Sequence, residues 1–477
     1  MAIQRFLYNT IILGNFLIQP ALASEFFYDI SNLIINNEPR MSYGVAVTDL
    51  DKDGSFEFIV TGFKYDNLAL SYEDGNVINI VNNELFSDKS RSTIGVASCD
   101  IDGDGFEEIY FLNTDTFSGQ KIYSDRILDN FFNFIDLFEF PENIENSNFT
   151  AGRSVACVDV NGDGVYSIYV SNYGGPTRMY TLSSNRLIDS APEFGINNTT
   201  GGRAIVSGHI LSEYMDIFAA NERGPNFLFR NTKNGFKDVA VEYNVDDTLQ
   251  NGRGTALSDI YYKGNLDIIT GNWKGFHRIY TLMGNSFADI SSEAFKQPSN
   301  IRTIISADFD NDGYDEIFLN NLGQGNKLFK ILRNGELKEI SLKTALEPKW
   351  FGTGAAVADI DNDGILELLI SHGETSPQPL SLFKAKVVDN AKYVRIKPLT
   401  TNYAPARGAT VILNTNMRNH AKTIDAGSGY LCQMEPVAHY GIRKEEEILG
   451  VTIKWTNGTS SDYEISELNK TYIFQQS

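Results

Sequence analysis

The chain has 477 residues, of which 42% are hydrophobic and 21% are charged, so it can bury one large core or form two domains. Its formal net charge of −21 argues against binding to nucleic acid or to anionic membranes and favours divalent cations at the surface. Three cysteines are too few for a small scaffold held together by disulfides.

The first 23 residues have the pattern of a cleaved signal peptide. Arg5 precedes a mostly apolar stretch over residues 6–18, and residues 21–23 supply the small side chains that signal peptidase prefers. Two asparagines interrupt the apolar stretch, which is also short for a membrane anchor. We therefore expect a mature chain from Ser24 onward, secreted or, in a Gram-negative bacterium, periplasmic, with no membrane insertion.

A segment of about fifty residues recurs seven times, with the first residue of an acidic turn at positions 49, 100, 159, 209, 259, 308 and 359. Each copy has a strand rich in Val, Ile and Ala, the turn, a second apolar strand and a weaker hairpin. Four strands per unit at this period are typical of a propeller blade. The sequence thus predicts an all-β fold, with a seven-bladed β-propeller over residues 24–385 and a small β-rich domain over residues 386–477.

The ring is expected to close with strands from both ends of the propeller. Residues 26–31 have the pattern of the last strand of a repeat, yet they precede the first copy. We expect them to complete the seventh blade beside its third strand, over residues 380–385. Closure of this kind removes an exposed sheet edge.

In four copies the turn reads D-x-D-x-D-G-x-x-E. Carboxylates at positions 1, 3 and 5, a glycine at 6 and a carbonyl at 7 are the arrangement used by calcium loops. The alternative is an acidic turn that is only solvated. An EF-hand is excluded because position 12 falls in an apolar strand. The expected ligands are Asp49, Asp51, Asp53 and Glu57; Asp100, Asp102, Asp104 and Glu108; Asp308, Asp310, Asp312 and Glu316; and Asp359, Asp361, Asp363 and Glu367.

The other three turns depart from this pattern. The third copy has Asp159, Asn161 and Asp163 but a serine at position 9, which predicts a weaker fifth calcium site. The fifth copy has Lys263 at position 5, where an ammonium can take the place of the metal. The fourth has lost the pattern, so the count is four calcium sites, a weaker one and two turns without calcium.

These turns and blades resemble the FG-GAP or VCBS repeats of integrin α chains and of many secreted bacterial proteins. The tail resembles the ASPIC/UnbV module through residues 407–409, 427–431, 439–441 and 453–458. The two together resemble the cartilage acidic protein family. This resemblance implies that calcium stabilises the turns of the blades and takes no part in chemistry.

Four consecutive copies carry an arginine six residues before the turn: Arg153, Arg203, Arg253 and Arg302. Equivalent positions in a propeller form a ring, so these side chains are expected on one side of the axial channel. One interpretation is an anion site for a carboxylate or a sulfated glycan. The other is that each arginine pairs with an acidic or carbonyl group of the neighbouring blade.

Cys99 and Cys157 lie in equivalent strands of adjacent repeats and so are candidates for a disulfide. Their offsets within the repeat differ by one residue, which would direct them to opposite faces of a strand. This offset predicts that Cys99, Cys157 and Cys432 are buried free thiols.

The sequence contains no GxSxG, P-loop, dinucleotide-binding or HExxH motif. The primary functional hypothesis is a calcium-binding, non-catalytic protein for binding or adhesion, whose partner is an extracellular glycan or protein. The alternative is an extracellular hydrolase or lyase that acts on polymers at the axial channel of the propeller.

Overall fold

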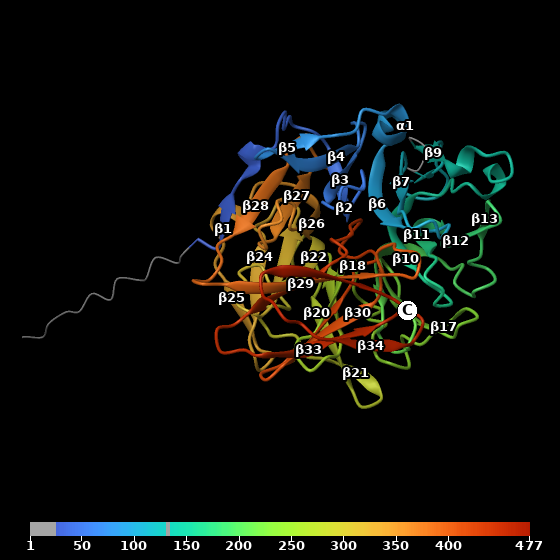
Figure 1. The fold of residues 1–477 in the computed structure, drawn as a ribbon. Coiled ribbons are helices and arrows are strands. Elements are labelled where there is room, and N and C mark those ends of the chain that lie inside the picture. The colour runs from blue at the N-terminus through green and yellow to red at the C-terminus, as the bar shows by residue number, and fades with distance from the viewer. Residues whose placement is uncertain (1–24, 130–133) are drawn as a thin grey trace, which may run out of the picture.

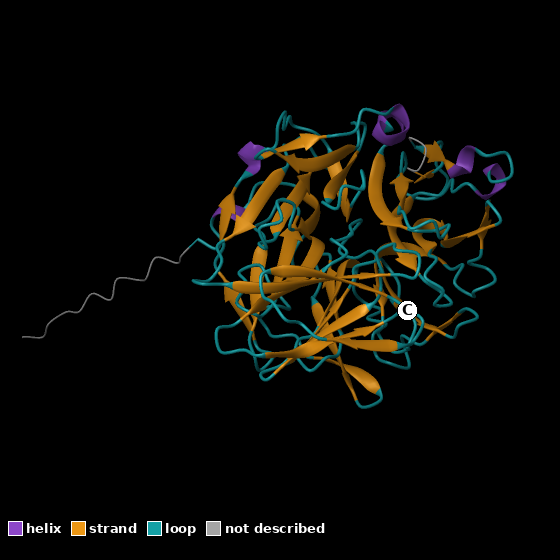
Figure 2. Cartoon of the chain, in the orientation of Figure 1, coloured by secondary structure: helices purple, strands orange, loops and turns teal. Residues whose placement is uncertain are grey.

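The structure is a computed structural model that describes residues 25–129 and 134–477. The predicted signal peptide, residues 1–23, lies outside the described residues. Strands dominate, and the helices are short segments between them (Figure 2). The predicted all-β class is confirmed. Within the described residues no helix combines the length and the apolar character needed to cross a membrane.

Blades 1 to 4 follow one another along the chain, each starting with its innermost strand. They consist of β2 (Ser42–Thr48), β3 (Glu57–Gly62), β4 (Leu68–Glu73) and β5 (Asn76–Asn79); β6 (Thr93–Cys99), β7 (Glu108–Asn113), β8 (Arg126–Asp129) and β9 (Ile135–Asp136); β10 (Gly152–Val158), β11 (Ser167–Pro176), β12 (Arg178–Ser183) and β13 (Arg186–Asp189); and β14 (Thr199–Gly208), β15 (Asp216–Asn221), β16 (Phe227–Asn231) and β17 (Phe236–Asp238). The long strands β11 and β14 also pair with each other, so blades 3 and 4 share one sheet.

Blades 5 to 7 complete the ring, in which each innermost strand contacts the next and β26 returns to β2. They consist of β18 (Gly252–Ser258), β19 (Asp267–Asn272), β20 (Arg278–Met283) and β21 (Ser286–Asp289); β22 (Ile301–Ala307), β23 (Glu316–Asn321), β24 (Lys327–Ile331) and β25 (Leu337–Ile340); and β26 (Gly352–Ala358), β27 (Glu367–His372), β28 (Ser381–Ala385) and β1 (Phe27–Asp29). The connections contain α1 (Glu84–Ser87), η1 (Ser31–Leu33), η2 (Lys89–Arg91), η3 (Leu137–Glu139), η4 (Ile144–Asn146) and η5 (Thr344–Leu346).

The ring closes as the sequence predicts. Strand β1 pairs antiparallel with β28, with Phe27 opposite Ala385, and the blue and orange strands lie side by side in Figure 1. Phe27 is buried, and its ring lies 5.2 Å from the ring of Phe309 in blade 6. The N-terminal strand therefore completes blade 7 and packs into the core between two blades.

The C-terminal domain has two sheets, ordered β32-β29-β35 and β31-β30-β33-β34. Its strands are β29 (Lys392–Leu399), β30 (Thr410–Thr415), β31 (Asn419–Thr423), β32 (Ala438–Ile442), β33 (Ile448–Lys454), β34 (Ser460–Tyr463) and β35 (Lys470–Gln475). They enclose a core of their own around the buried Trp455 and Tyr440.

A segment between β31 and β32, residues 425–436, enters the centre of the propeller, and we call it the plug. The amide of Gly429 donates to Thr255 in blade 5 at 2.7 Å, and the amide of Gln433 donates to Val45 in blade 1 at 2.9 Å. Gly429 has a φ of +62°, and a Cβ on it would lie 2.6 Å from the Thr303 side chain. Such close approach to an inner strand requires glycine.

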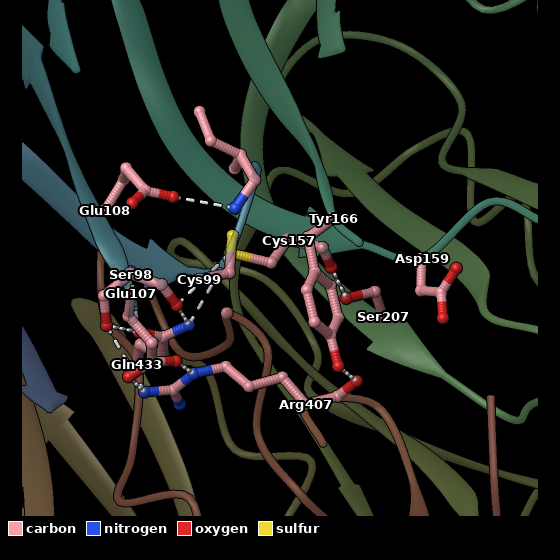
Figure 3. Close-up of a disulfide and its surroundings, with 12 residues drawn as sticks. Ser98, Cys99, Glu107, Glu108, Cys157, Asp159, Tyr166, Ser207, Arg407 and Gln433 are labelled. Carbon is pink, nitrogen blue, oxygen red and sulfur yellow. Dashed lines mark hydrogen bonds and ion pairs between the residues drawn. A yellow bond between two sulfur atoms is a disulfide. The ribbon is translucent and has the colours of Figure 1, made fainter. Parts of the chain in front are cut away.

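A disulfide joins Cys99 to Cys157, so the prediction of three free thiols is wrong for this pair (Figure 3). The two Cα atoms are 6.3 Å apart, one in β6 and one in β10. Adjacent blades pack face to face, so side chains on opposite faces of equivalent strands meet in the space between the blades. The one-residue offset therefore permits the bond. Cys432, in the plug, is a buried free thiol.

The disulfide gives a first testable prediction. Replacing both Cys99 and Cys157 by serine should lower the free energy of unfolding by about 2–4 kcal/mol, because the bond closes a loop with a sequence separation of 58. Denaturant unfolding of the oxidised protein and of the double variant measures this loss. Thiol titration is the control: protein denatured without reductant should show one reactive thiol, and three reactive thiols would contradict the bond.

Candidate functional site

The acidic turns of blades 1, 2, 6 and 7 share one backbone geometry. The glycine at position 6 has a positive φ, between +82° and +95°, and its amide donates to the aspartate at position 1. The glutamate at position 9 accepts the amide of position 2, as Glu108 does from Ile101 at 2.8 Å. In each turn three carboxylate oxygens lie within 4.8 Å of one another. The turns thus gather the oxygen donors that a hard cation prefers.

In blades 1 and 2 the converging groups are Asp49, Asp51 and Asp53, and Asp100, Asp102 and Glu108. Glu108 is buried, and its Oε1 has no hydrogen-bond partner in the part of the chain that the structure describes. Burial first, and then the carboxylates of Asp102 and Asp100, raise the pKa of Glu108 well above its usual value. Lys52, an exposed residue of the first turn, attracts Glu108 and Asp104 electrostatically. A buried carboxylate oxygen without a partner fits a calcium ligand in blade 2.

In blade 6 a lysine ammonium lies among the predicted calcium ligands. Lys330 on β24 places its Nζ 3.0 Å from Asp310, 2.5 Å from Asp312 and 3.1 Å from Glu316. Burial lowers the pKa of Lys330, but the three carboxylates, Glu316 first, outweigh it and raise that pKa above its usual value.

Blade 7 has the same arrangement. Lys384 on β28 lies 2.7 Å from Asp361, 2.8 Å from Asp363 and 2.6 Å from Glu367. In both blades the lysine faces the position 9 glutamate across the second and third strands. In this structure the turns of blades 6 and 7 therefore hold a lysine ammonium against the carboxylates that the sequence assigns to calcium.

The turns of blades 1 and 2 differ from those of blades 6 and 7 in one residue, which lies on the third strand and faces the glutamate at position 9. In blade 1 it is Ser71, which donates to Glu57 at 3.0 Å. In blade 2 the register places Asp129 there, which adds a further carboxylate near Glu108. Blades 6 and 7 thus carry a lysine at this position, whereas blades 1 and 2 carry Ser71 and Asp129 there.

The remaining turns have other arrangements. In blade 3, Asn161 donates to Asp163 at 2.8 Å and Thr456 donates to Asp159 at 2.7 Å, so side-chain groups already use these oxygens. In blade 5 the ammonium of Lys263 lies over the ring of Tyr261, 5.3 Å from its centre. The expectation that this ammonium occupies the metal position is therefore wrong.

The C-terminal domain docks on several of these turns. The amide of Gly441 donates to Asp308 at 2.8 Å, that of Ala421 donates to Asp259 at 3.1 Å, and Arg395 lies 3.3 Å from Asp359. The first aspartate of blades 5, 6 and 7 is thus an acceptor for the domain, as Asp159 is in blade 3.

Arg407 ties the domain to the ring at a fully buried position. Its guanidinium pairs with Glu107 and donates to Ser98 at 3.3 Å and to the carbonyl of Val47 at 2.8 Å (Figure 3). Gln433 of the plug accepts from the Ser98 amide at 2.9 Å. Arg407 therefore bonds to strands of blades 1 and 2 from a different domain.

The four arginines of the repeat come together on the face opposite the acidic turns. They start the innermost strands of blades 3 to 6 and surround Tyr430 at the tip of the plug. Arg203 pairs with Glu222, Arg253 lies 3.1 Å from the same carboxylate, and Arg302 pairs with Glu374. One cavity is thus lined by all four arginines, Arg153, Arg203, Arg253 and Arg302. Three of them also form the ion pairs that the alternative interpretation predicts.

Comparison with known proteins matches both parts of the chain. The FG-GAP-like repeat matches residues 259–319 and 308–370, and ASPIC and UnbV matches residues 399–477. Cartilage acidic protein 1 of Xenopus tropicalis is 44% identical over 464 residues, which cover 89% of this chain and 71% of the relative. The Homo sapiens protein of that name is 43% identical, covering 91% and 73%. The chain belongs to the cartilage acidic protein family.

Among solved structures, the BP39L lectin from Burkholderia pseudomallei is similar with a TM-score of 0.46 and 10% identity, over 72% of this chain and 99% of that one.

In this member of the cartilage acidic protein family, the motifs that identify the C-terminal module lie where it meets the propeller. Arg407 pairs with Glu107, residues 427–431 belong to the plug, and Gly441 donates to Asp308. The sequence indicated these motifs as signs of a module. Their common location shows that they build its contact with the blades.

Proposed function

We propose that this chain is a secreted, calcium-stabilised, non-catalytic binding protein whose calcium sites lie in blades 1 and 2. The calcium assignment rests on the buried Oε1 of Glu108, which has no hydrogen-bond partner among the described residues and has Asp129 rather than a lysine facing it. A cation bound there compensates carboxylates that the fold holds together, and so it stabilises the turn between β6 and β7. This is a smaller number than the four or five sites that the sequence predicts.

The plug supports a non-catalytic role over the alternative of a hydrolase or lyase at the axial channel. Residues 425–436 bond to inner strands of blades 1, 2, 3, 5 and 7, which puts a buried segment where a polymer would have to enter. The Cys99–Cys157 disulfide supports secretion, because such bonds persist in oxidising compartments.

Thermal unfolding with calcium or with chelator tests the calcium sites. Calcium should stabilise the protein by about 2.7 kcal/mol per site when it is present at about 100 times its Kd, since it binds the folded chain only. Asp102→Asn in blade 2 should remove a large part of this stabilisation. Asp310→Asn, at the same turn position in blade 6, is the matched control and should leave it intact.

An Asp102→Asn variant that responds to calcium like the unmodified chain would contradict the site in blade 2. A screen of extracellular glycans and peptides, read both for binding and for cleavage, tests the non-catalytic assignment. Turnover of any polymer would show that the alternative is right.

A further inference from the structure

The cavity around the four arginines has a volume of 290 Å³ and lies at the mouth of the axial channel, and we call it the arginine pocket. Tyr430 reaches it from the C-terminal domain, while the arginines come from four consecutive blades. The volume is close to the lower end, about 300 Å³, of the range for small-molecule sites. The pocket is therefore sized for a group no larger than a single ring.

The charges in the arginine pocket do not balance. Four guanidiniums line the cavity with two carboxylates, Glu374 and Asp115, and Glu222 beside it is shared by Arg203, Arg253 and the exposed Arg223, so positive charge is in excess. Arg153 bonds only to neutral oxygens among the described residues, namely those of Gly152, Thr114 and Phe117. An anion in the pocket would compensate part of this excess.

The arginines are buried close enough together to repel one another. Burial first, and then the charge of Arg203, lower the pKa of Arg253 to about 10. Burial alone would raise the pKa of Tyr430, yet the guanidiniums, Arg203 first, lower it below its usual value. The tyrosine hydroxyl thus lies in a positive potential that favours negative charge.

Two of the four guanidiniums have nitrogens without a hydrogen-bond partner among the described residues. The Nε and Nη1 of Arg302 and the Nε of Arg253 are buried without a hydrogen-bond acceptor. Unsatisfied buried donors are costly, and hydrogen bonds to an ionised acceptor are strong. An anion that accepts from the nitrogens of Arg302 would therefore be bound favourably.

Aromatic rings form the walls and rim of the pocket. Tyr43 and Phe63 line it, with their ring centres 5.7 Å apart, and Phe117 at the rim is 63% exposed. The rings of Tyr173 and Trp273 hold the guanidiniums of Arg203 and Arg302 at 4.4 Å and 4.3 Å. Exposed aromatic faces beside fixed cations are suited to a ring that carries an anionic group.

We propose that the arginine pocket binds a ring-sized organic group that carries one monoanionic oxyanion, a carboxylate or a sulfate. The guanidiniums pair with the oxyanion, the Tyr430 hydroxyl donates to it, and Phe117 and Phe63 contact the ring. This inference rests on the proposed function in one respect, namely that the protein binds its ligand without cleaving it. It adds the chemical class of that ligand.

Calorimetric titration of the full chain with D-glucuronate, with D-glucose 6-sulfate and with D-glucose tests the pocket. At least one of the two anions should bind, more weakly at high salt, and neutral glucose should not. Whichever anion binds identifies the oxyanion. Arg302→Gln should weaken binding about tenfold or more. Its partner Glu374 has a side chain 36% exposed, so the variant leaves no buried charge.

Arg278→Gln, which removes a guanidinium from β20 outside the pocket, is the matched control and should bind like the unmodified chain. Tyr430→Phe keeps the ring in place and should weaken binding several-fold, which keeps the test valid if Arg302→Gln does not fold. The proposal is overturned if neither anion binds at millimolar concentration, if glucose binds equally well, or if both pocket variants bind normally.

The calcium-dependent melting shift is measured on the same samples without sugar. An intact shift with no anion binding therefore rejects the arginine pocket alone. Cleavage of a polymer rejects the proposed function.

Discussion

Replacing Arg407 by methionine is expected to lower the free energy of unfolding by about 3–5 kcal/mol. The guanidinium is fully buried and pairs with Glu107, whose side chain is 5% exposed, so the substitution leaves a buried carboxylate without its partner. Donation to the carbonyl of Val47 is lost as well. Chemical denaturation, followed by tryptophan fluorescence and by circular dichroism of the whole chain, measures the loss.

The double variant Arg407→Met with Glu107→Leu is the control for this prediction. It removes both charges and should recover much of the stability, because a buried ion pair can be replaced by apolar side chains at little cost. A single variant as stable as the unmodified chain would show that Arg407 does not hold the domain on the propeller.

Replacing Lys330 by methionine is expected to convert blade 6 into a calcium-dependent blade. Without the ammonium, the carboxylates of Asp310, Asp312 and Glu316 repel one another, and the chain in chelator should lose about 3 kcal/mol of stability. Calcium should restore much of this loss, so the calcium-dependent rise in melting temperature becomes larger than in the unmodified chain. Differential scanning calorimetry in calcium and in chelator measures both effects.

Lys327→Met on the same strand provides the matched control, because Lys327 forms no ion pair among the described residues. It should leave the calcium response unchanged. An equal calcium response of the Lys330→Met variant and the unmodified chain would mean that the lysine does not substitute for the metal in blade 6.

The periodic features of the fold could be predicted from the sequence. The turns with glycine at position 6 repeat at nearly constant spacing, and each marks the hairpin between the first two strands of a blade. The closing strand was recognisable because residues around Phe27 repeat the pattern of the last strand. These predictions rest on local patterns that every blade repeats.

Contacts between blades and between domains were harder to predict. The free-thiol prediction assumes that side chains on opposite faces of equivalent strands point away from each other, whereas Cys99 and Cys157 meet between two adjacent sheets. Lys330 and Lys384 lie on third strands and face the glutamate at position 9 of the turn. The sequence pattern of the third strands is weak, so this register could not be predicted from it. Alignment of the third strands with one another would have found both lysines.

The repeat pattern gives no indication of the plug. Residues 427–431 read as a glycine-rich module motif, and nothing in their composition says that they fill the centre of another domain. The arginine positions were predicted correctly because they follow the repeat, but the place of Tyr430 among them depends on the docking of the module.

The pairing of β1 with β28 also sets an order for folding on the ribosome. Phe27 is synthesised early, but β1 cannot pair with β28 until Ala385 has been synthesised. The ring of blades therefore stays open until then. The plug is synthesised later still, after all seven blades. Contacts this distant along the chain predict slow, largely post-translational folding, and nascent fragments that depend on protection from aggregation.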